Sequence, residues 1–424
     1  MNILLLTVGS RGDIQPFVAL GHGLRAAGHQ VTVAAPALFE NFVREYGLRF
    51  APLNDDLLKL KDTAAGKDAL EGKGNKLALM KQVKPMLGRL MQDEWKAAQD
   101  GPDLIVYHPK TLVGLHIAEK LGVPAIMSIP LPLMTPTSAF PIPLITASLG
   151  GWFNRLTYLA NSLIYMPYNG MINAWRQETL GLPKRPRGLD ELTHSDGSPV
   201  PVLYSYSQRI VPRPADWLAH VQATGYWFLP PQNTYTPPLA LQRFLENGKP
   251  PIYIGFGSMT GNDPQGKARK VIEALSQAGQ RGLIASGWGG LHASDVPDHC
   301  FMIEEAPHDW LFEHVTAAVH HGGAGTTAAA LRAGKPQLIC PFMGDQGFWG
   351  QRVYQAGVGA KPIPQGHLSV ERLTAAFTSI ATDADMQHRA THMGEAIRAE
   401  DGVKTAVALI ERLALSTSTP MPVH

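Results

Sequence analysis

A glycine-rich turn between an apolar strand and a helix constrains this chain more than any other stretch. Residues 316–319 are an apolar strand candidate, His320-His-Gly-Gly-Ala-Gly-Thr-Thr327 follows, and residues 328–333 are good helix formers closed by Gly334. Glycines let a backbone approach a ligand closely, and the free N–H groups at a helix start favour an anion. The spacing is neither that of a P-loop nor that of the dinucleotide fingerprint. We interpret the turn as a diphosphate cradle, with a turn that serves only packing as the alternative.

Three side chains of this turn can contact a ligand directly. Thr326 and Thr327 offer hydroxyls, and His321 offers a ring that changes charge near neutral pH. A lone histidine is more often a core residue, but its place in the turn favours a ligand-facing role for His321. His320 should point elsewhere, and we expect it to be structural.

The chain is long enough for two domains of ordinary size, since 424 residues exceed what one hydrophobic core usually sustains. Apolar strand candidates alternate with helical patterns in both halves. The strand candidates lie at residues 2–8, 31–35, 103–107, 124–127, 202–205, 251–257, 283–286, 301–303, 317–319 and 337–340. This alternation predicts an α/β fold with two Rossmann-like, doubly wound parallel sheets that face each other across a cleft.

Proline composition marks the boundary between the halves. Residues 230–238 read as an extended linker. We therefore predict a first domain at 1–230, a linker at 231–248 and a second domain at 249–400. An amphipathic terminal helix at 401–415 should pack back on the first domain, and 416–424 should be a disordered tail.

Charge and cysteine content bear on partners and compartment. A formal net charge of +2 gives no reason to expect nucleic acid as a partner. Cys300 and Cys340 do not make a disulfide framework, so a reducing cytoplasm fits best. The first residues run into a strand pattern without a basic region, so we do not expect a signal peptide.

Two stretches have compositions that could indicate contact with a membrane. Residues 121–154 carry no charge, but six prolines forbid a continuous spanning helix. We interpret them as the apolar wall of a pocket, with a proline-rich core loop as an equal alternative. Residues 73–99 form a basic helical stretch with interleaved apolar residues. A solvated lysine face is the favoured explanation, and peripheral docking on an anionic membrane is the other.

Five short motifs together resemble the UDP-glycosyltransferase superfamily, and the similarity is closest to its sterol 3-beta-glucosyltransferase and antibiotic aglycone glycosyltransferase branch. They are 10–16 (SRGDIQP), 254–259 (IGFGSM), 306–311 (APHDWL), 320–327 (HHGGAGTT) and 341–346 (PFMGDQ). The resemblance implies the two-domain GT-B fold, with an acceptor-binding first domain and a nucleotide-sugar-binding second domain. It also implies an activated nucleotide sugar as co-substrate, no permanently bound cofactor, and inverting transfer without a required metal.

The resemblance also implies roles for particular residues. Asp345 and Gln346 would bind the sugar hydroxyls, and the segment at 306–308 would meet the nucleotide base. The donor-binding set is Ser10, Gly12, Gly257, Ser258, Ala306, His308, His321, Gly323, Gly325, Thr326, Asp345 and Gln346. A glutamate that contacts the ribose in plant-type members is replaced here by Ala329.

Asp13 occupies the slot that holds a histidine base in plant-type members. We predict that Asp13 is the general base that takes the acceptor proton, with His108 as its partner. The alternative is that Asp13 is an ordinary helix N-cap. For the acceptor we predict contacts from Met134, Phe140 and Trp152.

The expected function is therefore transfer of a hexose, glucose from UDP-glucose, to the hydroxyl of a sterol or similar lipid. A nearer rival is transfer of a deoxysugar to a polyketide or flavonoid. Rivals of another class are a sugar-nucleotide epimerase and a non-catalytic sugar-nucleotide binding protein. The epimerase would not need a large apolar acceptor wall, and the binding protein would not need Asp13.

Overall fold

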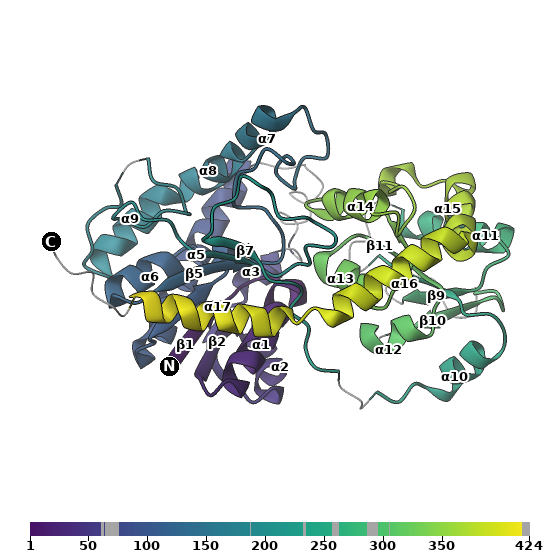
Figure 1. The fold of residues 1–424 in the computed structure, drawn as a ribbon, viewed down its shortest axis with the longest axis horizontal. Helices are drawn as coiled ribbons and strands as arrows, with labels where there is room; N and C mark the ends of the chain where they lie inside the picture. Colours follow the sequence, from purple (N-terminus) through teal and green to yellow (C-terminus); the bar gives the residue numbers. More distant parts are fainter. Residues whose placement is uncertain are drawn as a thin grey trace.

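The computed structural model describes residues 1–60, 63, 76–186, 188–231, 235–256, 263–285, 296–304 and 306–417. It contains two parallel sheets with helices packed around them (Figure 1). We call the β1–β7 sheet with its helices the N-terminal domain and the β8–β12 sheet with its helices the C-terminal domain. The predicted fold class, two doubly wound parallel sheets, is confirmed.

The first sheet has the strand order β3-β2-β1-β4-β5-β6-β7, and all of its strands are parallel. Apart from the edge strand β3, its strands are mostly buried and apolar, as expected for a parallel sheet covered on both faces. Their bounds are β1 (Asn2–Leu6), β2 (Gln30–Pro36), β3 (Arg49–Leu53), β4 (Leu104–Tyr107), β5 (Ala125–Ile129), β6 (Val202–Tyr204) and β7 (Val221–Ala223).

The second sheet is also fully parallel, in the order β10-β9-β8-β11-β12. Its bounds are β8 (Ile252–Gly255), β9 (Gly282–Ala285), β10 (Cys300–Ile303), β11 (Ala317–His320) and β12 (Gln337–Ile339). Both cysteines are buried and free.

Helices connect the strands of the first sheet and cover its faces. They are α1 (Arg11–Ala26), η1 (Ala37–Phe39), α2 (Glu40–Glu45), α3 (Asp56–Leu60), α5 (Lys76–Ala97), η2 (Ala98–Asp100), η3 (Pro109–Thr111), α6 (Gly114–Leu121), α7 (Gly151–Thr157), α8 (Leu159–Tyr165), η4 (Met166–Tyr168) and α9 (Asn169–Glu178). The helices that follow are α10 (Leu239–Glu246), α11 (Pro264–Gln277), α12 (His308–Glu313), α13 (Ala324–Arg332), α14 (Gln346–Gln355), η6 (Gln365–His367), α15 (Val370–Thr382), α16 (Ala384–Ala399) and α17 (Gly402–Thr417).

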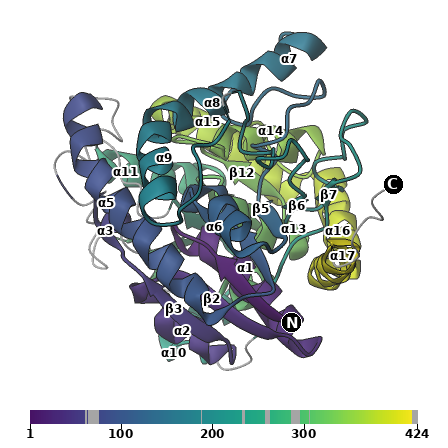
Figure 2. The same cartoon turned by 90° about the vertical axis from the view of Figure 1, so that its left-hand side faces the viewer.

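The chain crosses back to the N-terminal domain at its end. Figure 1 shows the yellow chain passing from α16, beside the second sheet, to α17 beneath the first. α17 packs against α1, and its Ala406, Val407 and Ile410 join the buried cluster of that helix. At the crossing, Glu400 accepts a hydrogen bond from the Ser207 hydroxyl at 2.8 Å. Figure 2 shows α17 at the edge of the same domain.

Several details differ from the sequence expectation. Residues 239–246, assigned to the linker, form α10, because Leu241 is buried in the C-terminal domain and the ring of Phe244 packs on Phe301 at 5.2 Å. α17 continues through residues 416 and 417, which were assigned to the tail, and residues 418–424 lie outside the described residues. Strands β3 and β7 were not predicted.

The basic stretch at 73–99 is mostly α5. The side chains of Leu87, Leu90 and Met91 are buried in the domain core, while Lys81 and Lys84 are exposed. Residues 73–75 lie outside the described residues. In the described part of the chain, the model contains no helix with the length and apolarity that a membrane span requires.

Candidate functional site

Each sheet has one point where the strand order reverses, and there the loops leave in opposite directions. In the first sheet this point lies between β1 and β4, which pair with Leu6 opposite Tyr107. In the second sheet it lies between β8 and β11, with Gly255 opposite His320. Open α/β sheets bind ligands at such points, beyond the carboxyl ends of the strands. The loops that follow these four strands contain most of the residues that the sequence singled out.

Asp13 lies in the loop and helix start that follow β1. Ser10, not Asp13, is the N-cap of α1. Asp13 is the third residue of the helix and completes a capping box with Ser10, so it does stabilise the helix start, from a position other than the predicted one. Its Oδ2 accepts hydrogen bonds from the Ser10 backbone N–H at 2.9 Å and from the Ser10 hydroxyl at 3.3 Å. Gly9, at φ +136°, makes room for the carboxylate, because a Cβ there would lie 2.2 Å from Asp13 Oδ2.

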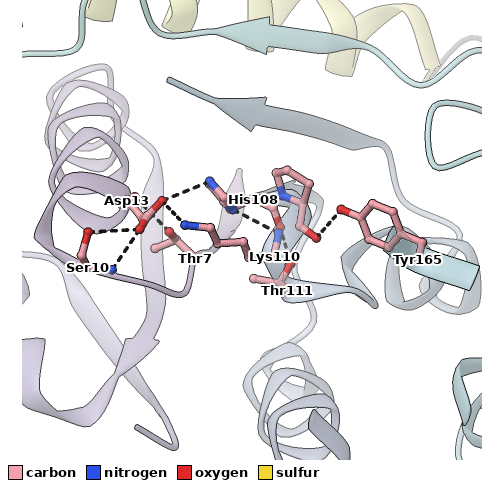
Figure 3. Close-up of polar contacts among 8 residues, drawn as sticks. Thr7, Ser10, Asp13, His108, Lys110, Thr111 and Tyr165 are labelled. Carbon is pink, nitrogen blue, oxygen red and sulfur yellow. Dashed lines mark hydrogen bonds and ion pairs between the residues drawn. The ribbon is translucent and has the colours of Figure 1, made fainter. Parts of the chain in front are cut away.

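The second carboxylate oxygen of Asp13 faces the loop after β4 (Figure 3). Asp13 Oδ1 lies 2.7 Å from Lys110 Nζ and 3.5 Å from His108 Nε2. The Lys110 backbone N–H donates to His108 Nδ1 at 3.1 Å, so in the neutral ring Nε2 carries the proton and points at Asp13. The structure therefore brings together the two residues of the predicted catalytic pair.

Electrostatics assign different roles to the two side chains. Burial first, and then the charge of Lys110, lower the pKa of His108 to about 3, although Asp13 opposes this, so the ring stays neutral. Burial acts to raise the pKa of Asp13, but Lys110, His108 and the Ser10 N–H outweigh it and hold the pKa below its usual value. Asp13 is thus an anion that can accept a proton, and His108 is suited to orient it.

The predicted cradle is the turn between β11 and α13, and Gly323 is the N-cap of that helix. His320 is fully buried: its Nδ1 accepts from the Gly322 N–H at 3.0 Å, and its Nε2 lies 2.8 Å from Gln337 Oε1. The structural role predicted for His320 is confirmed. A Cβ on Gly325 would meet nothing within 4 Å, so the first turn of α13 presents open space to an anion.

His321 and Thr326 flank the start of α13 and are half-buried. Burial lowers the pKa of His321, while its contact with the carbonyl of Gly255, at the end of β8, opposes the shift. The ring therefore lies beside the end of β8. Gly257 and Ser258, predicted to bind the diphosphate, lie outside the described residues.

Asp345 and Gln346 begin α14, after β12. Asp345 Oδ2 accepts from Trp349 Nε1 at 2.8 Å, and Gln346 Oε1 accepts from the backbone N–H groups of Phe342 and Met343 at 2.7 and 3.1 Å. These bonds fix the loop that carries both predicted sugar-binding residues. Burial raises the pKa of Asp345, and the Trp349 hydrogen bond opposes it.

The charges of Lys110 and Asp13 also act on the Asp345 carboxyl, the first lowering and the second raising its pKa. Charged groups of the two domains therefore lie close enough to interact. The charge of Arg11 in α1 likewise acts on His308 in α12. Burial first, and then the Arg11 charge, lower the pKa of the His308 ring to about 4. The His308 ring stacks on Phe312 at 4.9 Å, and Ala306 beside it is half-buried.

The three predicted acceptor residues have different surroundings. Met134 is buried in the core of the N-terminal domain. Phe140 is buried between the domains, with its ring 5.6 Å from that of Phe348 and 4.8 Å from the Arg352 guanidinium. Trp152 on α7 is 74% exposed. The structure does not gather these three side chains around one pocket.

A cavity of about 250 Å³ does lie in the N-terminal domain, next to the loop that follows His108. Its walls come from the ends of β4 and β5, the residues after His108, and α9, and they include Tyr107, Pro109, Met127, Tyr165 and Ile172. Tyr165 donates a hydrogen bond to the Pro109 carbonyl at 3.1 Å. Sequence reasoning missed this cavity and Lys110. The signal for Lys110 was its place two residues after His108, in a loop that follows a strand at the switch point.

Two family models match the chain. Residues 3–140 match the glycosyltransferase family 28 N-terminal domain, and residues 289–411 match the erythromycin biosynthesis protein CIII-like C-terminal domain.

In the described part of the chain, no group of three or more His, Cys, Asp or Glu side chains is arranged to hold a metal ion.

The chain is also similar to curated proteins along most of its length. It is 36% identical to a sterol 3-beta-glucosyltransferase of Arabidopsis thaliana, over 100% of this chain and 69% of the relative. It is 38% identical to a sterol 3-beta-glucosyltransferase of Emericella nidulans, over 97% of this chain and 30% of the relative. The chain thus spans less than a third of the length of the fungal relative.

Solved structures share the fold. The glycotransferase of kitacinnamycin superposes with a TM-score of 0.72 at 19% identity, over 97% of this chain and 98% of that one. A spinosyn rhamnosyltransferase complexed with thymidine diphosphate superposes with a TM-score of 0.65 at 19% identity, over 97% of this chain and 100% of that one.

Proposed function

Because this chain belongs to the sterol 3-beta-glucosyltransferase family of glycosyltransferases, we propose that it transfers glucose from UDP-glucose to the hydroxyl of a sterol or similar apolar alcohol. The family resemblance predicted from the sequence motifs is confirmed. The observation that carries the proposal is the Asp13 carboxylate, which is held at the switch point of the first sheet by Ser10, with Lys110 Nζ at 2.7 Å and His108 Nε2 at 3.5 Å.

In the proposed reaction the acceptor hydroxyl attacks the anomeric carbon from the side opposite the diphosphate. Asp13 takes the hydroxyl proton, the new C–O bond forms as the bond to the diphosphate breaks, and the diphosphate leaves with the electron pair. This sequence inverts the anomeric centre. A base with a low pKa accepts the proton only as the attack makes the hydroxyl acidic, so proton transfer is coupled to bond formation.

The leaving diphosphate gains negative charge as the bond breaks. We propose that the amides at the start of α13, the Thr326 hydroxyl and the His321 ring stabilise it, with Gly257 and Ser258 contributing from the preceding loop. The hydrogen bonds of His320 to the Gly322 N–H and to Gln337 hold the turn before α13 in place, so little reorganisation of that turn is needed. Asp345 and Gln346 would bind the sugar hydroxyls.

A panel of donors and acceptors tests this proposal. The protein is incubated with UDP-glucose, other UDP-sugars or dTDP-deoxysugars and with cholesterol, a plant sterol, a flavonoid or a long-chain alcohol, and the release of nucleotide diphosphate is measured. We expect the highest rate with UDP-glucose and a sterol, and a product with inverted configuration. A dTDP-deoxysugar with a flavonoid as the best pair would replace the proposal by its nearer rival. Epimerised donor without transfer would replace it by the epimerase.

A further inference from the structure

Exposed apolar side chains are concentrated on one segment of the N-terminal domain. Ten of the seventeen large hydrophobic residues that are exposed in the described chain lie between residues 144 and 166. We call these ten the α7–α8 apolar surface: Leu144, Ile145, Leu149, Trp152, Phe153, Leu156, Leu159, Leu163, Ile164 and Met166. Single exposed hydrophobics are ordinary, but a contiguous group of this size marks an interaction site.

In the helices that carry this surface, polar side chains face the protein interior and apolar side chains face outward. Their buried positions include Asn154 and Asn161, whose side-chain amides donate to the carbonyls of Ser138 and Leu133 at 3.0 and 2.9 Å. The apolar residues point outward instead. A helix on a water-facing surface has the opposite arrangement. The hydrogen bonds of the asparagines, together with the buried Tyr158, therefore fix an orientation in which the outer face presents apolar side chains.

Figures 1 and 2 place α7 and α8 at the upper edge of the N-terminal domain, where they project from the rest of the fold. Between residues 121 and 175 the only charged side chain is Arg155, and it pairs with Asp216 at 3.0 Å. Protein interfaces usually have a polar, charged rim. A surface without acidic residues and with an exposed tryptophan fits the interface of a lipid bilayer better.

This surface is continuous with the candidate active site. Tyr165, the last residue of α8, hydrogen-bonds the carbonyl of Pro109, the residue after His108, and lines the cavity of about 250 Å³ beside it. Water is a poor solvent for a sterol, so a short path between the bilayer and the site favours transfer. Resting on the proposed function, a bilayer docked at α8 would lie next to the loop that carries His108.

We propose that the α7–α8 apolar surface docks on a lipid bilayer and takes the acceptor from it. The basic helix α5 contributes at most long-range attraction, because Leu87, Leu90 and Met91 are buried in the core. It belongs to the same domain, and its Gln92 donates a hydrogen bond of 3.3 Å to Thr179, just after α9. Its exposed Lys81 and Lys84 can favour anionic lipid.

The test uses flotation with phosphatidylcholine vesicles that contain cholesterol and a minor fraction of phosphatidylserine. The variant is Leu159→Ser with Leu163→Ser, at positions that are 61% and 64% exposed. The matched control is Leu38→Ser with Leu239→Ser, at 57% and 60% exposed positions outside the surface. We expect the variant to bind vesicles at least about tenfold more weakly than the wild type, and the control to bind as the wild type does.

Transfer assays then separate docking from chemistry. We expect the variant to lose transfer to vesicle-borne sterol and to keep transfer to the same sterol dispersed in detergent. Should the variant fail to fold, Leu149→Ser at a 70% exposed position replaces it.

Equal flotation of variant and wild type, or a wild type that does not float, would overturn the docking proposal. The docking proposal would also be overturned if the wild type were an oligomer, the variant a monomer, and flotation unchanged. The surface would then bind a second copy of the chain. Reduced flotation of the variant, with no transfer by the wild type to any sterol, would leave docking in place and remove the proposed function instead.

Discussion

Replacing Lys110 by methionine should change the pH dependence of transfer. The lysine ammonium lies 2.7 Å from Asp13 Oδ1 and helps to hold the pKa of that carboxyl below its usual value. Methionine keeps an unbranched apolar side chain but removes the charge. Without the charge the protonated, inactive form of Asp13 becomes easier to populate, so activity should be lost at a higher pH than in the wild type.

The size of the change follows from the geometry. Lys110 is 55% exposed but the Asp13 side chain is only 14% exposed, so the dielectric constant of water gives a lower bound for the pair. Opposite unit charges at 2.7 Å then interact by about 1.5 kcal/mol, which corresponds to about one pKa unit. The other groups that face Asp13, namely His108, Ser10 and Asp345, are unchanged in the variant.

The assay is kcat/KM for the acceptor between pH 4 and pH 9. The wild type should keep its activity down to the acid end, and the midpoint of the acid limb in Lys110→Met should lie at least about one unit higher. Lys110→Arg, which keeps the charge, should follow the wild type. A uniform loss of activity with an unchanged profile would show that Lys110 acts only through structure and would refute the electrostatic reasoning.

Three further results are expected. Gly9→Ala should cut kcat/KM strongly and lower Tm, because the new Cβ would lie 2.2 Å from Asp13 Oδ2. Gly12→Ala should leave Tm unchanged. Equal Tm values for the two variants would contradict the steric role of Gly9. His320→Ala should lower the free energy of unfolding in urea by about 3 kcal/mol, because the Gly322 N–H and the Gln337 side chain lose their buried partner. His321→Ala should change the free energy of unfolding by less than about 1 kcal/mol, and it should weaken UDP-glucose binding. Chelation with EDTA should leave transfer unchanged, since we propose that amides and hydroxyls stabilise the diphosphate; loss of activity restored by Mg²⁺ would count against that proposal.

The fold was predictable because its signals are local. Continuous apolar runs such as residues 2–6 and 317–320 mark buried parallel strands, and the helices between them follow the 3.6-residue period. Strand β3 was missed because Arg49 and Pro52 interrupt its apolar run, and β7 because Gln222 separates its two apolar residues. α10 was missed because the neighbouring prolines dominate the composition of the linker.

The candidate site was predictable only in part. The loops after β1 and β11 carry motifs, so Asp13 and His321 could be named from the sequence alone. Lys110 could not, because its approach to Asp13 depends on the pairing of β1 with β4 across 97 positions of sequence. The acceptor side was weakest: an uncharged stretch predicts apolar surroundings, but burial of Phe140 and exposure of Trp152 are decided by tertiary packing.

The most direct test of the central claim is the Asp13→Asn variant, measured for UDP-glucose binding by calorimetry and for transfer to a sterol. Asparagine keeps an oxygen for the Ser10 N–H but cannot take a proton. The account predicts unchanged donor affinity and Tm, with transfer reduced by about 10²–10⁴-fold. Transfer at the wild-type rate, with the donor bound normally, would contradict the assignment of Asp13 as the base.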